Sequence, residues 1–183
     1  MSGTPSVMLD AAAIDRALKR ISHEIIERNR GCETICLVGV CRRGVPLANR
    51  LSDYMLQIEG TRVPVGSLDI TRYRDDIEKT ADLPVLNATN VPFDINGRDV
   101  VLVDDVLFTG RTARAAMDAL IEMGRPATVQ LAVLVDRGHR ELPIRGDYIG
   151  KNIPTAQNER IAVKVPEYDG QTAVLLYRKD EIL

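Results

Sequence analysis

Aromatic residues are scarce in this chain of 183 residues, at 4% of the total, and tryptophan is absent. Hydrophobic residues still reach 45%, so an aliphatic core is expected. No apolar run approaches the roughly 18 residues of a membrane-spanning helix, and the N-terminus lacks the layout of a signal peptide. The sequence therefore predicts a soluble, cytoplasmic protein with no membrane partner, folded as a single domain over residues 1–183.

Metal-binding and disulfide patterns are also missing. The three cysteines (Cys32, Cys36 and Cys41) are odd in number and lack a Cys-x-x-Cys spacing, and there are only two histidines. We expect free thiols and no metal held directly by protein side chains. The net charge of −2 gives no global attraction to nucleic acid, so any RNA binding requires a local basic patch.

The most informative segment present runs from Val100 to Thr112. An apolar, β-branched run without polar alternation ends in two adjacent carboxylates, followed by a Thr/Gly loop and a helix-like stretch. This order predicts a buried parallel strand whose carboxyl end faces a ligand. Hydroxyls and backbone N–H groups at a helix start favour an anion, so we expect a phosphate against Val106, Leu107, Phe108, Thr109, Gly110, Arg111 and Thr112.

Asp104 and Asp105 come directly before this loop and are suited to bind vicinal hydroxyls. A ribose 5-phosphate carries both a phosphate and such hydroxyls. The alternative is an ordinary strand end followed by a Thr cap of the next helix. The segment has neither the Gly-Lys-Thr of a Walker A loop nor the three spaced glycines of a dinucleotide fingerprint.

Strand and helix patterns alternate through the middle of the chain, which predicts an α/β fold with a mostly parallel central sheet flanked by helices. A polar segment over residues 71–98 is typical of a flexible flap. Helices are expected from Asp10 to Gly31, over 44–58 and over 111–123. Strands are expected over 34–40, 63–70, 100–104 and 127–135, and near 145–150, 160–165 and 172–177.

Polar groups follow the other strands of this predicted edge. Arg42 and Arg43 suit a diphosphate, because guanidinium groups match phosphate geometry; the alternative is a pair of solvated arginines. Arg74 would reach an anionic ligand from the flap, unless this part is a surface hairpin of ion pairs. The segment Asp136-Arg137-Gly138-His139-Arg140 is placed to contribute to the far wall of the site.

Two groups of cations would form a basic surface for RNA phosphates if they lie together. The alternative is an ordinary solvated helix face, since acids are interleaved with them. One group lies on the polar face of the first helix, and the other follows the strand that ends near residue 135. The candidate RNA-binding residues are Arg16, Lys19, Arg20, His23, Arg28, His139, Arg140, Arg145 and Lys151.

Residues 100–112 resemble the phosphoribosyl-pyrophosphate (PRPP) signature of type I phosphoribosyltransferases. Together with the segments 20–29, 68–76 and 124–155, nearly the whole chain resembles the bifunctional pyrimidine-operon attenuation regulators that have uracil phosphoribosyltransferase activity. The resemblance implies a type I phosphoribosyltransferase fold with a reduced hood, assembled as a homodimer or larger oligomer. It also implies that a uridine nucleotide, UMP or UTP, promotes binding to a stem-loop of the operon's leader mRNA.

The reaction implied is uracil plus PRPP giving UMP and pyrophosphate, with Mg²⁺ bound mainly by the substrate. Asp104, Asp105 and Arg43 would carry catalysis, with the two acids contacting Mg²⁺ through water, and uracil would lie near Val135 to Arg137. Three departures from the family stand out: Arg42 replaces a Thr, Arg72 replaces a Leu, and Ala156-Gln157 replaces Ser-Arg or Ser-Lys. A salvage enzyme without an RNA role, or an RNA-binding sensor with vestigial catalysis, remain alternatives.

Overall fold

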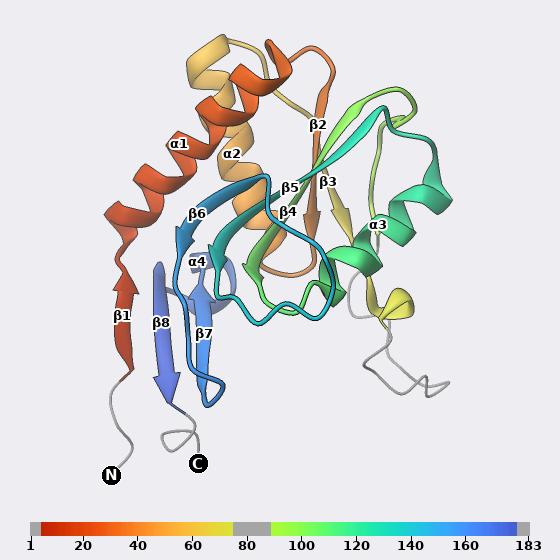
Figure 1. Ribbon diagram of the computed structural model, residues 1–183. Helices are drawn as coiled ribbons and strands as arrows, with labels where there is room; N and C mark the ends of the chain where they lie inside the picture. Colours follow the sequence, from red (N-terminus) through yellow and green to blue (C-terminus); the bar gives the residue numbers. More distant parts are fainter. Residues whose placement is uncertain (1–4, 75–88, 179–183) are drawn as a thin grey trace.

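The chain contains two β-sheets in the computed structural model, which describes residues 5–74 and 89–178 (Figure 1). A five-stranded sheet has the order β3-β2-β4-β5-β6, and all of its paired strands are parallel. Its strands are β2 (Ile35–Val40), β3 (Val65–Leu68), β4 (Asp99–Leu107), β5 (Thr128–Asp136) and β6 (Tyr148–Asn152). The predicted α/β class with a mostly parallel central sheet is confirmed.

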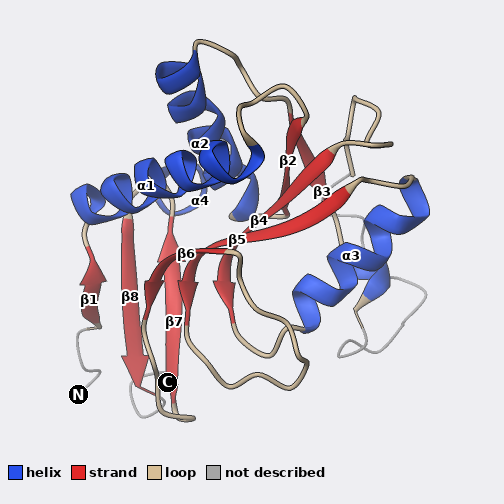
Figure 2. Ribbon diagram, turned by 45° about the horizontal axis from the view of Figure 1, so that its top comes forward, coloured by secondary structure: helices blue, strands red, loops and turns tan. Residues whose placement is uncertain are grey.

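Helices cover both faces of this sheet. The long helices α1 (Ala11–Asn29) and α2 (Gly44–Glu59) pack on one face, and α3 (Arg111–Met123) lies on the other (Figures 1 and 2). Every residue of β2 is buried, as expected for an apolar strand covered on both sides. Within the described ranges, no helix is long and apolar enough to span a membrane.

The boundaries of α1 follow its capping residues. Asp10 accepts a hydrogen bond from the Ala13 N–H through Oδ1 at 2.7 Å, and Arg30 ends the helix in a left-handed conformation. Gly31 then donates its N–H to the Ile26 carbonyl at 3.0 Å. The predicted helix from Asp10 to Gly31 therefore matches α1 and its caps.

A second, antiparallel sheet has the order β1-β8-β7, with β1 (Ser6–Leu9), β7 (Glu159–Lys164) and β8 (Ala173–Arg178). The short helix α4 (Pro166–Asp169) connects β7 to β8. Val163 and Val174 pack in the same core cluster as Ile14 and Leu47, so both sheets share the core beneath α1 and α2. The sequence patterns missed β1 and α4, which are four residues each and too short to show a period.

The structure also corrects the end of β4. The strand was expected to stop at the two acids, but it continues to Leu107, because pairing with β5 extends to Asp136. The residue that caps α3 is Gly110 rather than Thr109. Of the expected flap, Thr71–Tyr73 form the 3₁₀ helix η1, and residues 75–88 lie outside the described part of the chain.

Two glycines bring the start of α2 against the central strands. A Cβ atom on Gly44 would lie 2.3 Å from the carbonyl oxygen of Val103, and one on Gly39 would lie 2.5 Å from the Cα atom of Val45. Such distances leave no room for any side chain. The absence of side chains at these positions therefore places Arg43, the residue before α2, close to the carboxyl end of β4.

Replacing Gly44 by Ala tests this contact. We expect Gly44→Ala to lower the free energy of unfolding by about 1–3 kcal/mol, because the new methyl group must push α2 away from β4. Urea denaturation measures the loss, with Asn49→Ala on the exposed face of α2 as the control. Equal denaturation midpoints for Gly44→Ala and the wild type would contradict the close contact.

Candidate functional site

A cavity of about 400 Å³ opens at the carboxyl end of β4. Its wall includes Asp104 from the strand, the N-terminal residues of α3, and Arg74 from the segment after η1. All seven residues of the predicted phosphate loop line it: Val106, Leu107, Phe108, Thr109, Gly110, Arg111 and Thr112. A carboxylate, a cation and the start of a helix thus surround one space.

The loop geometry suits an anion at the start of α3. Gly110 has a φ of 93°, in the left-handed region that favours glycine, and it has no side chain with which to cap the helix. The Arg111 N–H reaches Thr109 Oγ1 at 3.3 Å, a long hydrogen bond. The first amides of α3 therefore point toward the cavity with little competition from side chains, as in helix-terminal phosphate sites.

The two carboxylates lie at the end of β4 with restricted access to water. Asp104 Oδ1 accepts the Asp105 N–H at 2.9 Å, and Asp105 Oδ1 accepts the Val106 N–H at 2.8 Å. Burial raises the pKa of both carboxyls, and for Asp104 the neighbouring Asp105 charge raises it further, while Arg74 opposes the shift. The pair thus carries unfavourable negative charge that a bound cation or a positively charged sugar would stabilise.

The predicted pyrophosphate residues Arg42 and Arg43 directly precede α2 and are not among the residues that line this cavity, but the adjacent Gly44 packs against Val103 and Asp104 of β4. Arg42 is exposed, and the peptide bond that precedes it is cis. The Arg43 guanidinium donates to Asp169 of α4, from Nε at 3.2 Å and from Nη2 at 2.9 Å. This hydrogen bonding raises the pKa of Arg43. The sequence alone did not reveal that Asp169 is the partner of Arg43.

The predicted uracil-side residues follow β5. Val135 is buried, and Asp136 accepts from Arg140 Nη2 at 2.5 Å and from the Gly138 N–H at 3.0 Å. Arg137 is buried as well, and burial lowers its pKa. Its guanidinium donates to Thr155 Oγ1 at 3.0 Å and to the Glu159 carbonyl at 2.7 Å. The side chains of Asp136 and Arg137 are therefore both hydrogen-bonded within the protein, which leaves backbone groups to face a base.

Phe108 connects the phosphate loop to this wall. The Arg137 guanidinium lies 4.1 Å from the centre of the Phe108 ring, a cation–π distance, and the His139 ring meets the same ring edge-on at 5.9 Å. Phe108 is the most exposed residue of the loop at 41%. No sequence signal marked this stacking, because the partners lie about thirty residues apart.

Residues 137–142 are hydrogen-bonded directly to the phosphate loop. The Arg137 N–H donates to the Leu107 carbonyl at 3.0 Å, and Arg140 Nη1 donates to the Phe108 carbonyl at 2.7 Å. The Glu141 N–H donates to the Thr109 carbonyl at 2.9 Å, and Arg111 pairs with the Glu141 carboxylate at 2.7 Å. A displacement of the phosphate loop would therefore also move Arg140 and the neighbouring His139.

The predicted RNA-binding residues fall into two places. Arg20 donates to the Gly150 carbonyl of β6 at 2.6 Å, and Arg28 pairs with Asp147, the residue before β6, at 2.6 Å. The side of α1 that carries these two arginines, here called the α1–β6 face, therefore contacts β6. Arg140 instead is bound to the phosphate loop, and His139 Nε2 lies 2.6 Å from the Thr155 carbonyl oxygen. Lys19 instead lies over the ring of Tyr54 in α2, at 5.4 Å from its centre. Arg16 and His23 are also in α1, Lys151 is in β6, and Arg145 is exposed in the loop before β6.

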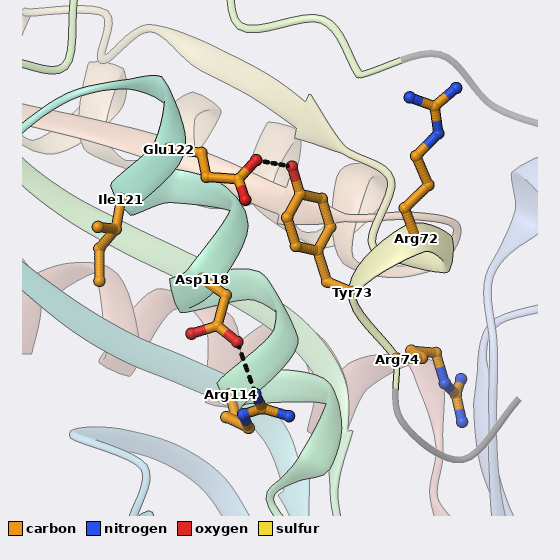
Figure 3. Close-up of a pocket in the computed structure, with 7 residues that line it drawn as sticks. All are labelled: Arg72, Tyr73, Arg74, Arg114, Asp118, Ile121 and Glu122. Atoms are coloured by element: carbon orange, nitrogen blue, oxygen red, sulfur yellow. Dashed lines mark hydrogen bonds and ion pairs between the residues drawn. The ribbon is translucent and has the colours of Figure 1, made fainter. Parts of the chain in front are cut away.

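A shallow groove of about 710 Å³ lies between η1 and α3, and it shares Arg74 with the cavity (Figure 3). Tyr73 donates its hydroxyl to Glu122 at 2.6 Å, and Arg114 pairs with Asp118 at 3.1 Å. Arg72, one of the departures from the family, is an exposed residue on this rim. The groove is open and of mixed charge, and it adds no residue to the predicted site besides Arg74.

The side chains that the structure describes do not form a metal centre by themselves. Among the described residues, no three or more His, Cys, Asp or Glu side chains come together so as to hold a metal ion. Asp104 and Asp105 still offer carboxylate oxygens, the ligands that Mg²⁺ prefers. An ion at this site would thus take most of its ligands from a substrate or from water.

The buried acid pair predicts a dependence of stability on pH. In the unfolded chain the Asp104 carboxyl ionises near pH 4, whereas the folded protein holds its proton to higher pH. Folding therefore loses stability as the pH rises from about 4 through the raised folded pKa. Asp104→Asn keeps the Oδ1 acceptor and removes this loss, so its melting temperature should exceed that of the wild type at neutral pH.

Thermal unfolding between pH 4 and 8 measures the difference in melting temperature between Asp104→Asn and the wild type, at about 2–4 °C for each kcal/mol regained. This difference should widen as the pH rises from about 4 to the raised pKa of Asp104 in the folded protein, and it should stay constant above that pKa. Asp53→Asn, which neutralises an exposed carboxylate on α2, is the control for the loss of one negative charge. A wild type that melts higher than Asp104→Asn at pH 8 would show that burial does not dominate at Asp104.

Comparison with known proteins agrees with this geometry. Residues 7–169 match the phosphoribosyl transferase domain family. A hypoxanthine phosphoribosyltransferase from Staphylococcus aureus has the same fold, with a TM-score of 0.73, 18% identity and coverage of 97% of this chain and 94% of that one. One from Trypanosoma cruzi has a TM-score of 0.75, 17% identity and coverage of 100% and 99%.

Curated relatives are far closer in sequence. The "Bifunctional protein PyrR" of Listeria monocytogenes is 58% identical over 96% of this chain and 97% of that protein. That of Deinococcus deserti is 54% identical over 100% of both chains, and that of Clostridioides difficile is 59% identical over 92% of this chain and 96% of that one. The chain therefore belongs to the phosphoribosyltransferase domain family and, within it, to the bifunctional PyrR proteins.

Proposed function

We propose that this protein converts uracil and PRPP to UMP and pyrophosphate, and that it also regulates its pyrimidine operon. With a uridine nucleotide bound, it binds a stem-loop of the leader mRNA and promotes transcription termination. The observation that carries the enzymatic part is the cavity at the end of β4, where Asp104, Arg74 and the whole phosphate loop meet. Membership of the bifunctional PyrR family supports both parts.

In this assignment the 5-phosphate lies against residues 106–112 at the start of α3. Its charge is stabilised by the uncapped amides and the helix dipole. Asp104 and Asp105 accept hydrogen bonds from the ribose hydroxyls. Phosphoribosyl transfer loosens the bond from the ribose C1 to pyrophosphate before the base arrives, so positive charge builds on the sugar. The desolvated carboxylates stabilise that charge, because burial has removed the water that would screen it.

In this assignment the leaving pyrophosphate lies toward Arg43 and Arg42, which precede Gly44 beside the end of β4, and Arg74 adds a cation from the wall of the cavity. A guanidinium group matches the geometry of phosphate oxygens. Carboxylate oxygens suit Mg²⁺, so Asp104 and Asp105 would help to hold an ion that enters the site as part of the substrate complex. When bound, it would neutralise charge on the diphosphate.

Uracil lies beside residues 135–137, where the side chains of Asp136 and Arg137 are already engaged. Its polar groups must then be met mainly by backbone N–H and C=O groups. The exposed Phe108 ring closes this side of the cavity and is held by Arg137.

The regulatory part is supported by the hydrogen bonds between the phosphate loop and residues 137–142. A nucleotide that orders this loop also orders Arg140, through the Phe108 carbonyl, and His139, through its contact with the Phe108 ring. The α1–β6 face would supply cations for the RNA backbone. A homodimer or larger homo-oligomer, as the resemblance implies, would repeat that face and extend it along a stem-loop.

A turnover assay with uracil, PRPP and Mg²⁺ tests the enzymatic assignment. Asp105→Asn and Thr109→Ala should each cost at least about 2–4 kcal/mol of transition-state stabilisation, because each removes a preorganised contact to the ribose or its phosphate. Asp99→Asn makes the same change at the opposite end of β4 and should retain turnover. Near-normal rates in both site variants would refute the assignment, and an inactive wild type that binds RNA would indicate a sensor with vestigial catalysis.

Leader-RNA binding, with and without UMP, tests the regulatory assignment. Arg20→Glu should weaken binding and reduce the slope of log affinity against log salt by about 1 or more, because a phosphate contact is lost. Turnover should persist, since Arg20 contacts β6 rather than the cavity. Arg62→Glu, an exposed arginine after α2, is the control. Arg140 is unsuitable for this test because it is bound to Phe108 of the phosphate loop.

Unchanged affinity and salt slope in Arg20→Glu would place the RNA surface elsewhere. Turnover without any UMP-dependent binding of the leader would instead favour a salvage enzyme that has no RNA role.

A further inference from the structure

We propose that Asp169 is a positioning residue that holds the Arg43 guanidinium in place for pyrophosphate. The short helix α4, which connects β7 to β8 of the antiparallel sheet, would thereby set the geometry of the leaving-group side of the site. This inference deepens the proposed function and rests on it.

The contact between Arg43 and Asp169 is bidentate. Nε and Nη2 of Arg43 donate to the two carboxylate oxygens at 3.2 and 2.9 Å, so one whole edge of the guanidinium is fixed. Among the described residues, Asp169 is the only group to which the Arg43 side chain donates. The other edge, with Nη1, therefore remains available to a ligand, and the Arg43 side chain is still 34% exposed.

Asp169 is itself held independently of Arg43. Its Oδ1 also accepts from Lys164 Nζ at 3.2 Å, and its Oδ2 accepts the Val165 N–H at 3.0 Å. The side chain is only 9% exposed. These partners, Arg43 first among them, hold the pKa of Asp169 well below its usual range, so the carboxylate stays charged at working pH. A fixed, charged acceptor is what a positioning role requires.

The location of Arg43 connects this pair to the predicted chemistry. The residue directly follows Arg42 and precedes Gly44, whose missing side chain lets α2 touch Val103 of β4. The charge of Asp105 acts on Arg43 as well and contributes to its raised pKa. A Cβ atom on the adjacent Gly44 would lie 3.4 Å from the Cα atom of Asp104, so Arg43 follows the chain close to the carboxylate pair while its guanidinium is bound by Asp169.

Glu167 adds a weaker contact between α4 and α2, through an ion pair with Arg50 at 3.6 Å. It lies in the same short helix as Asp169 and is exposed. This makes it a matched control, because Glu167→Gln removes a carboxylate from α4 without touching Arg43.

Without Asp169, the long Arg43 side chain would regain rotamer freedom that pyrophosphate binding must then remove. We expect Asp169→Asn to raise KM for PRPP, and KM for pyrophosphate in the reverse reaction, by about tenfold or more. KM for uracil should change little, because the base lies at the other end of the cavity. Glu167→Gln should leave all three values near those of the wild type.

A double-mutant cycle separates positioning from a general structural effect. If Asp169 acts through Arg43, Asp169→Asn should add almost nothing in an Arg43→Ala background. Additive effects, or an unchanged KM for pyrophosphate in folded Asp169→Asn, would overturn the inference. Thermal unfolding shows whether each variant is folded.

If Asp169→Asn does not fold, Lys164→Gln gives the answer, because it removes one anchor of the same carboxylate. A rise in the pyrophosphate KM supports positioning, and an unchanged value opposes it. A wild type with no phosphoribosyl transfer would refute the proposed function itself. A wild type that turns over, with no shift in these variants, would refute only the role of Asp169.

Discussion

The desolvated carboxylate pair at the end of β4 is the constraint around which the site is built. Asp104 and Asp105 occupy the last part of a strand that is paired on both sides up to Val103, and burial raises the pKa of both groups. Such a pair reduces the stability of the empty protein. The surrounding structure compensates through the tightly packed aliphatic layers above and below the sheet.

The elements around the pair each bring one kind of group to it. The start of α3 provides uncapped amides, the segment after η1 provides Arg74, and the close approach of α2 provides Arg43. Residues 137–142 then join the phosphate loop to the far wall by backbone hydrogen bonds. Because these contacts originate from separate strands of one parallel sheet, the packing of that sheet fixes their relative positions.

Most of the central sheet could be predicted from the sequence, because strands covered on both faces need continuous apolar runs, as in residues 35–40 and 128–135. The bounds of α3 were also predicted, since Gly110 and Gly124 flank it. β1 and α4 were missed because four residues carry no periodicity. The pairing of Arg43 with Asp169 could not be predicted, because it joins positions 126 residues apart and arises only when the two sheets pack.

The α1–β6 face, together with the adjacent Lys19, is partly neutralised within the protein. Lys19 pairs with Asp15, Arg20 with Glu24 and Arg28 with Asp147. An RNA phosphate bound at this face would compete with a carboxylate already present at each of these cations, so an unrelated transcript would gain little from a single contact. A folded RNA would have to engage several of these cations together to stay bound, and the face would then select among RNAs rather than bind them all.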